Sequence, residues 1–194
     1  MVMNMSNNIS KHVIDSINKL SNKDYELSLT AICLAIDATS RNEYKMISKV
    51  GDRYKKFIQD NISIITKASM GFNLQGNMYF SDVFSKESSM NSSDDAPSIS
   101  FAEIIYKARC SLVHEAELPQ QLKFIDDNRI IVDEKSITLP ISIVYGLLFS
   151  VIGARSNIIN NTKSNLLINF KKRSLPLDSF WGQKKKIEQY LFEE

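Results

Sequence analysis

Apolar residues recur at helical spacing over most of the first two thirds of the chain. Residues at positions i, i+3, i+4 and i+7 share one face of a helix, so this spacing indicates amphipathic helices. It predicts one helix from residue 9 to 20 and a second from residue 21 or 22 to 38. A third covers 45–67, a fourth starts after Ser100, and a fifth covers 140–154 with Pro140 in its first turn. The pattern therefore predicts a mainly α fold, a helical bundle.

The fourth helix has the clearest start signal. Ser100 is followed three residues later by Glu103, the spacing of a capping box, in which each side chain binds the backbone N–H of the other residue. The buried stripe that follows consists of Phe101, Ile104, Ile105, Ala108 and Leu112. Pro119 cannot continue the helix.

Two segments interrupt the helical pattern. Residues 70–98 are rich in Ser, Asn, Gly and Asp and predict a long polar loop, although the apolar patch in 78–84 indicates that part of it packs onto the core. After the fourth helix, Leu122–Ile125 and Arg129–Val132 predict a β-hairpin insertion, with a further strand at Ser136–Leu139.

The last forty residues are less regular. Asn165–Phe170 fits a strand or a helix, whereas Gln183–Phe192 fits a helix. We expect one helical domain over residues 1–160, which includes the 70–98 loop and the 122–139 hairpin. Residues 161–194 form a C-terminal extension of the same domain.

Composition limits the function classes. The chain is 43% hydrophobic, enough for a packed core, and its net charge of +2 is too small to indicate a nucleic-acid binder. Its longest uncharged apolar stretch, 139–154, is shorter than the roughly 20 residues that span a bilayer. No signal peptide is visible at the start, and two cysteines make neither a disulfide framework nor a four-ligand zinc site. We expect a cytoplasmic protein with no membrane contact, no metal and no cofactor, since phosphate-binding glycine motifs are absent as well.

The candidate chemistry centres on Arg109 and His114 on the fourth helix. The other histidine, His12, has no acidic or nucleophilic residue at an informative spacing. Imidazole suits proton transfer near neutral pH, and a guanidinium offers a planar fork of donors to phosphate oxygens. Together they fit RNA cleavage without a metal, in which the ribose 2′-oxygen attacks the phosphorus and the 5′-oxygen departs.

The run from Tyr106 to Glu115, with arginine, four residues and histidine near the end of a late bundle helix, resembles the signature of the HEPN family of all-helical nucleotide-binding and ribonuclease domains. The order of helices over residues 24–154 is similar to that family as well. The position after the arginine is usually polar in the family, commonly asparagine, and here it is Cys110.

The resemblance implies a metal-independent endoribonuclease that leaves a 2′,3′-cyclic phosphate or a 3′-phosphate. It implies that Arg109 and His114 are catalytic and that the protein is a homodimer with a composite active site. It also implies RNA as the substrate, and a toxin or phage-defence role with an antitoxin or regulatory protein as a further partner. Tyr106, Lys107 and Cys110 are the expected substrate-binding residues.

Helical geometry agrees with a dimer. At about 100° per residue, positions five apart point about 140° away from each other, so Arg109 and His114 do not share a face. Either the helix ends before His114, or a second copy packs against the arc of Tyr106, Cys110 and Val113 and brings both residue types to one cleft.

Purely structural roles for Arg109 and His114 are the alternative to the catalytic hypothesis. Arg109 also fits an ion pair with Glu103, Glu115 or Glu117, and His114 fits a contact with a carbonyl group at the helix end. A non-catalytic HEPN-like module that binds RNA, a nucleotide or a protein stays open, and so does a purely structural protein.

Two further features fit either an ordinary surface role or a functional role. Asp37 and Arg41 fit an ordinary surface pair at i, i+4, or residues that face the cleft. The basic clusters Lys171–Arg173 and Lys184–Lys186 fit a solvated surface or an extension of the RNA path.

Overall fold

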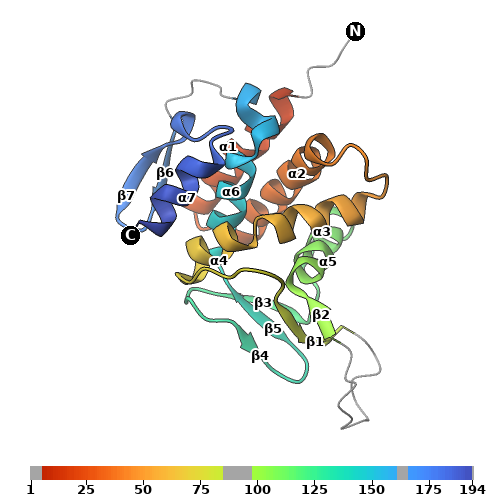
Figure 1. Cartoon of the computed structure of the whole chain (residues 1–194). Coiled ribbons are helices and arrows are strands. Elements are labelled where there is room, and N and C mark those ends of the chain that lie inside the picture. Colours follow the sequence, from red (N-terminus) through yellow and green to blue (C-terminus); the bar gives the residue numbers. More distant parts are fainter. Residues whose placement is uncertain (1–5, 85–97, 161–165, 194) are drawn as a thin grey trace.

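The computed structural model of the chain describes residues 6–84, 98–160 and 166–193. This part of the chain is mainly α-helical, as predicted, with short strands at its edges (Figure 1). The helices are α1 (Ser6–Ser21), α2 (Tyr25–Glu43), α3 (Val50–Asp60), α4 (Ile62–Met70), α5 (Phe101–His114), α6 (Ile143–Gly153) and α7 (Lys184–Phe192), with 3-10 turns η1 (Arg155–Asn160) and η2 (Leu177–Ser179). The strands are β1 (Tyr79–Ser81), β2 (Ser98–Ser100), β3 (Leu122–Ile125), β4 (Ile131–Val132), β5 (Ile137–Pro140), β6 (Leu167–Phe170) and β7 (Arg173–Pro176).

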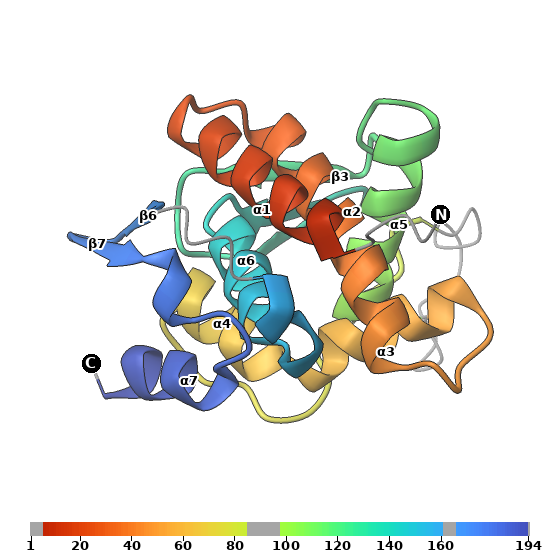
Figure 2. The same cartoon turned by 90° about the horizontal axis from the view of Figure 1, so that it is seen from above.

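Helix α6 lies at the centre of the bundle, because ten of its eleven residues are buried. It crosses α4 closely at Gly146, where an added Cβ atom would lie 2.6 Å from the Cα of Ile65. Figures 1 and 2 show α3 and α5 on one side of α6, and α7 with β6 and β7 on the opposite side. Helix α5 and the C-terminal elements therefore lie on opposite sides of the bundle and do not share one face.

The single helix expected over 45–67 is wrong in both its start and its continuity. The helix begins only at Val50, and it breaks at Asn61 into α3 and α4. The Asn61 side chain donates a hydrogen bond to the Phe57 carbonyl at 2.8 Å, and such a local bond competes with the helical ladder. The break redirects the apolar residues of α4 onto α6.

The hairpin expected between 122–125 and 129–132 is also wrong. Strand β3 pairs in parallel with β5, and β4 pairs antiparallel with β5, so β5 is the central strand. The central position goes to the strand with the most apolar burial, since β5 is largely buried and both residues of β4 are exposed. Pro140 ends β5 and does not open the fifth helix, which starts at Ile143. Proline has no N–H to donate to the sheet, and this loss is tolerated best at the end of a strand.

The segment 70–98 is only partly a loop. It contains β1, which pairs antiparallel with β2, and Val83 is buried while Met78, Phe80 and Phe84 pack against the core. The expected packing of this apolar patch is thus confirmed, except for the exposed Tyr79. Residues 85–97 lie outside the described residues.

The C-terminal region completes the same core. Sequence analysis left 165–170 open between a strand and a helix. The structure forms strand β6 over Leu167–Phe170, and Asn165 lies outside the described residues. Phe170 contacts the ring of Phe149 on α6, with ring centroids 5.1 Å apart. Trp181 and Ile187 are buried in the main hydrophobic cluster, and the helix expected near 183–192 is confirmed as α7.

Candidate functional site

Helix α5 carries the five residues that sequence analysis assigned to catalysis and substrate binding. It starts where predicted, because the Ser100 hydroxyl accepts from the Glu103 N–H at 3.2 Å and Glu103 Oε2 accepts from the Ser100 N–H at 3.2 Å. The helix is regular through His114, and the Glu115 N–H closes its last turn on the Ser111 carbonyl at 2.7 Å. His114 is therefore still helical, and the possibility that the helix ends before it is excluded.

Arg109 forms an ion pair with Asp37 of α2. Its Nε donates to Asp37 Oδ2 at 2.8 Å, and a terminal guanidinium nitrogen donates to the same oxygen. The two side chains are only 14% and 13% exposed. This pair joins α5 to α2 across 72 positions of the sequence.

The electrostatics of this pair are set mainly by burial and by Asp37. Burial opposes the charge on the guanidinium, but the hydrogen bond and the negative charge of Asp37, with a contribution from Cys110, raise the pKa of Arg109 above its ordinary value. The second carboxylate oxygen, Asp37 Oδ1, is buried and has no hydrogen-bond partner among the described residues. The site thus contains a fixed cation and one unused acceptor.

The partners expected for Arg109 nearby in the sequence, Glu103, Glu115 and Glu117, are wrong. The structure pairs it with Asp37, and Glu103 instead lies 3.8 Å from the Nζ of Lys55. The interpretation of Asp37 and Arg41 as a surface pair is wrong for the same reason, since the carboxylate of Asp37 faces α5. The spacing within the sequence favoured local partners, whereas helix packing supplied a distant one.

His114 lies apart from Arg109 in the single chain. It is exposed at the end of α5, whereas the guanidinium of Arg109 is directed at α2. The other histidine, His12, is half-buried on α1, where burial lowers its pKa against the opposing charge of Asp15. One chain therefore does not bring the imidazole of His114 and the guanidinium of Arg109 to one phosphate.

Tyr106 and Cys110 lie side by side on α5. The ring of Tyr106 packs over Gly51, where an added Cβ atom would lie 3.0 Å from it, and its centroid is 5.5 Å from that of Tyr54. Burial, together with a hydrogen bond to Cys110, raises the pKa of Tyr106. One face of the Tyr106 ring is thus held against α3, and only the remaining surface is open to a ligand or a second copy.

Lys107 is exposed next to these residues. Its Nζ lies 5.1 Å from the centroid of the Phe84 ring, a cation–π distance. This contact holds the lysine near the segment that precedes α5.

The outward side of α5 forms a continuous stripe. Its members are exposed or half-exposed and recur at helical spacing: Glu103, Tyr106, Lys107, Cys110, Val113 and His114. The centre of the stripe holds the small side chain of Cys110, and Figure 2 shows α5 at the outer side of the molecule. Small residues on a helix surface allow a second helix to approach closely.

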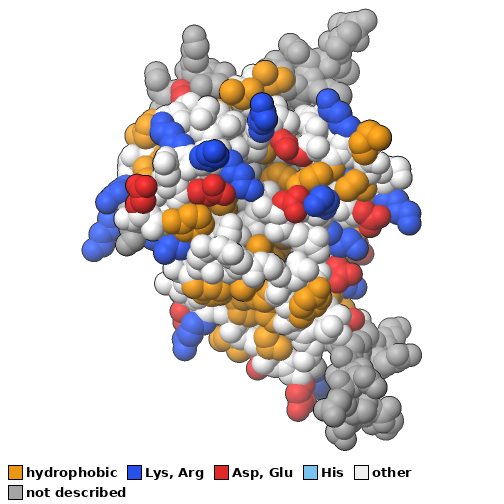
Figure 3. Space-filling view, in the orientation of Figure 1, with side chains coloured by type: hydrophobic (Ala, Val, Ile, Leu, Met, Phe, Trp, Pro, Cys, Tyr) orange, Lys and Arg blue, Asp and Glu red, His pale blue; other side chains and the backbone are white. Residues whose placement is uncertain are grey.

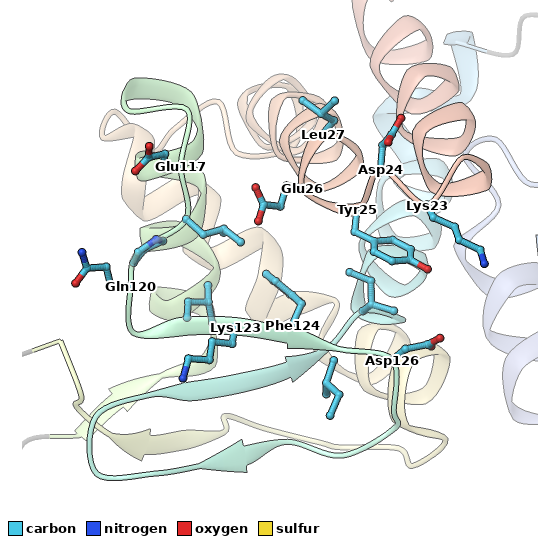
Figure 4. Close-up of a pocket in the computed structure, with 15 residues that line it drawn as sticks. Lys23, Asp24, Tyr25, Glu26, Leu27, Glu117, Gln120, Lys123, Phe124 and Asp126 are labelled. Atoms are coloured by element: carbon cyan, nitrogen blue, oxygen red, sulfur yellow. The ribbon is translucent and has the colours of Figure 1, made fainter.

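A pocket of about 780 Å³ lies beyond the end of α5, between the start of α2 and strand β3 (Figure 4). Sequence analysis did not identify it, because its walls come from segments almost one hundred positions apart. Its walls include the residues of β3 and the carboxylates of Asp24, Glu26, Glu117 and Asp126. This excess of negative charge is unfavourable for a phosphate backbone.

The two basic clusters lie on the other side of the bundle from α5, at the β6–β7 turn and at the start of α7 (Figures 1 and 3). Arg173 lies over the Tyr190 ring at 5.8 Å and Lys186 over the Phe180 ring at 5.2 Å. The Nζ of Lys184 donates to the Asp60 carbonyl at 2.9 Å. The clusters therefore do not extend a groove at α5 directly.

Within the described ranges, no group of three His, Cys, Asp or Glu residues is arranged to hold a metal ion. None of the helices in the same ranges is both long and apolar enough to cross a bilayer.

Comparison with known proteins identifies the family. The chain is a mainly α-helical protein whose candidate site lies on one capped helix. The family model described as Rv1289 matches residues 8–193, so the chain belongs to the Rv1289 family. No curated protein and no solved structure gives a significant match.

Proposed function

We propose that this protein is a metal-independent endoribonuclease of the HEPN type that acts as a homodimer. The observation that carries the proposal is the outward stripe of α5, which leaves Tyr106, Cys110 and Val113 half-exposed between Arg109 and His114. Packing of two such stripes around a two-fold axis brings two arginines and two histidines into one cleft.

A second copy is required because α5 is one regular helix through His114. Residues five apart on such a helix diverge by about 140°, and here one is directed at α2 while the other is exposed. The composite site uses Arg109 of one protomer with His114 of its partner.

The Arg109–Asp37 pair supports a role in phosphate binding. Asp37 Oδ2 takes the Nε and one terminal nitrogen of Arg109, and this fixes the plane of the guanidinium. The other terminal nitrogen takes no part in these contacts with Asp37, and we propose that it donates to a non-bridging phosphate oxygen. A guanidinium that is already oriented loses little side-chain entropy when the phosphate binds.

His114 serves proton transfer. In the reaction, the 2′-oxygen loses its proton and bonds to phosphorus, and the bond from phosphorus to the 5′-oxygen breaks as that oxygen gains a proton. The products are a 2′,3′-cyclic phosphate and a 5′-hydroxyl. The imidazole of one His114 removes the first proton or supplies the second, and a water molecule makes the other proton transfer.

The experiment is cleavage of a fluorescently labelled single-stranded RNA in the presence of EDTA. We expect wild type to cut, and His114→Ala to lose at least about a hundredfold in rate, the lower range for an acid–base group. His12→Ala is the matched control and retains the rate. Analytical ultracentrifugation checks that all three remain dimers.

Mixing two inactive variants tests the composite site. Arg109→Lys and His114→Ala, each inactive alone, regain activity after subunit exchange, because a mixed dimer contains one intact arginine–histidine pair. A monomeric wild type, or cleavage that survives in His114→Ala, would overturn the proposal.

A non-catalytic HEPN-like module that binds RNA, a nucleotide or a protein is the second candidate. It is favoured by the burial of the Arg109–Asp37 pair, since a paired guanidinium with 14% exposure also serves as a simple link between helices. Wild type that binds the labelled RNA in EDTA without cutting it would decide for this module.

The proposed setting is the cytoplasm, where the reduced thiols of Cys33 and Cys110 are stable. A toxin or phage-defence role, restrained by an antitoxin or regulatory protein, follows from the HEPN resemblance. RNA degradation after expression in cells, abolished by His114→Ala, tests this setting.

A further inference from the structure

Strand β3 is an edge strand that borders the pocket at the start of α2. Among the described strands it pairs with β5 alone, on one side. All four of its residues, Leu122 to Ile125, line the pocket. Successive residues of a strand point to opposite faces, so a pocket on one face would be lined by every second residue. The pocket therefore runs along the open edge of β3.

The backbone of β3 offers hydrogen-bonding groups to this pocket. The Ile137 N–H donates to the Gln121 carbonyl and the Ile141 N–H to the Ile125 carbonyl, both at 2.8 Å. In a parallel pair, alternate residues face the partner strand, so the N–H and C=O groups of Phe124 face away from β5. Neither group forms a hydrogen bond with another described residue.

The side chains around this edge are of two kinds. The floor is apolar and consists of Leu118, Leu122, Phe124, Ile125 and Ile141. Four carboxylates and two lysines surround it: Asp24, Glu26, Glu117, Asp126, Lys23 and Lys123. None of these six side chains takes part in an ion pair within the described ranges.

Two of the four carboxylates, Glu26 and Glu117, lie across the pocket from the sheet. Figure 4 shows Glu26 at the start of α2 and Glu117 after α5, on either side of the gap above β3. The net negative charge of the walls attracts a cationic ligand and repels a nucleic-acid backbone. The volume of about 780 Å³ lies in the range of sites that enclose a ligand.

We propose that this edge and pocket bind an extended segment of a partner protein by strand addition. The segment alternates basic and apolar side chains. Its backbone pairs with Phe124, its apolar side chains contact the floor, and its lysines or arginines contact Glu26 and Glu117. Main-chain pairing supplies affinity in such complexes, and the pockets for alternate side chains supply specificity. The proposal is independent of RNA cleavage.

The probe is a synthetic peptide of alternating lysine and valine, six residues long, with acetylated and amidated ends. We expect it to shift the amide resonance of Phe124 in nitrogen–proton correlation spectra of the full chain. A glutamate–valine peptide of equal length produces no shift. N-methylation of the lysine–valine peptide at the alternate backbone nitrogens that face β3 weakens binding about tenfold, because the N–H that pairs with the Phe124 carbonyl is lost.

Variants of the protein locate the charge contribution. Glu26→Gln with Glu117→Gln weakens binding of the lysine–valine peptide about tenfold, and the weakening diminishes as salt is raised. Glu134→Gln is the matched control, because Glu134 is an exposed acid outside the pocket. It leaves the affinity unchanged.

Three results would overturn the proposal. The first is no shift at Phe124 with the peptide at millimolar concentration. The second is equal binding of the N-methylated peptide. The third is loss of peptide binding when the chain dimerises, which would assign this edge to an interface between copies of the chain.

Discussion

The Nε of Arg109 on α5 donates a hydrogen bond to Oδ2 of Asp37 on α2 at 2.8 Å, and the second oxygen of Asp37 is buried without a partner among the described residues. The pair orients Arg109, the proposed phosphate-binding residue, and it also joins helices α5 and α2. Variants that replace both Arg109 and Asp37 are therefore needed to separate the contribution of the pair to stability from its contribution to catalysis.

Removing one partner of this pair is expected to be costly. Arg109→Met leaves a mostly buried carboxylate without its cation, and the loss of unfolding free energy should approach the 3–5 kcal/mol typical of broken buried pairs. Asp37→Leu combined with Arg109→Met recovers most of this loss, because no unpaired charge remains. Urea denaturation followed by circular dichroism measures both.

The control for this cycle is Arg129→Met. Arg129 pairs with Asp127 in a surface turn, where its side chain is 75% exposed, and its loss is expected to leave the urea midpoint unchanged. A urea midpoint that is equally unchanged in Arg109→Met would show that the pair with Asp37 does not stabilise the fold.

The start of α5 is expected to be pH-sensitive. A hydrogen bond from the Ser100 N–H, opposed by partial burial and assisted by the Ser100 hydroxyl and nearby lysines, lowers the pKa of Glu103 below its ordinary 4.5. A carboxyl group with a lowered folded-state pKa stabilises the fold above the unfolded pKa and loses this effect as pH falls through the folded value.

Wild type should therefore be more stable than Glu103→Gln at pH 7, and the difference should shrink as pH falls below about 4.5. Urea titrations of both proteins between pH 7 and pH 3 provide the measurement. A difference that is constant with pH would contradict the assignment. Ser100→Ala, which removes the cap itself, should cost about 1 kcal/mol at neutral pH.

The two thiols are expected to differ in reactivity. Burial raises the pKa of Cys33 to about 12, so its thiolate is absent at neutral pH and reagents do not reach it. Cys110 is half-exposed on the outer stripe of α5. An aromatic disulfide reagent should modify Cys110 alone in the native protein, slowly where the proposed dimer covers the α5 stripe, and both thiols after unfolding. Cys110→Ser should show none in the native state; a native reaction in this variant would disprove the burial of Cys33.

Gly146 is expected to be irreplaceable at the crossing of α4 and α6. In an ordinary helix interior, Gly→Ala stabilises by up to about 1 kcal/mol. Here the new Cβ atom would lie 2.6 Å from the Ile65 Cα and 2.7 Å from its carbonyl oxygen, so the helices must separate. We expect a loss of about 1–3 kcal/mol in urea denaturation, while Ser63→Ala on the other side of α4 changes little. A gain in stability for Gly146→Ala would contradict the close crossing.

The helices were the most predictable part of the fold. Amphipathic spacing located α1, α2, α5 and α7, and the capping box of Ser100 and Glu103 located the start of α5 to the residue. These signals depend on neighbours three or four positions apart, which the sequence displays directly. The break at Asn61 was missed because both halves of the predicted helix have the same apolar period.

The sequence alone determined that the chain is mainly α-helical and that Arg109 and His114 would point in different directions on a shared helix, because helix periodicity is a local property; that the helix runs through His114 came from the structure. Only the tertiary structure decided that β3 pairs with β5 in place of its sequence neighbour, that Arg109 pairs with Asp37, and that a pocket forms between α2 and β3. Each of these depends on which distant segments pack together, and the packing energy that selects them is shared by the whole core and is not contained in any single stretch of the chain.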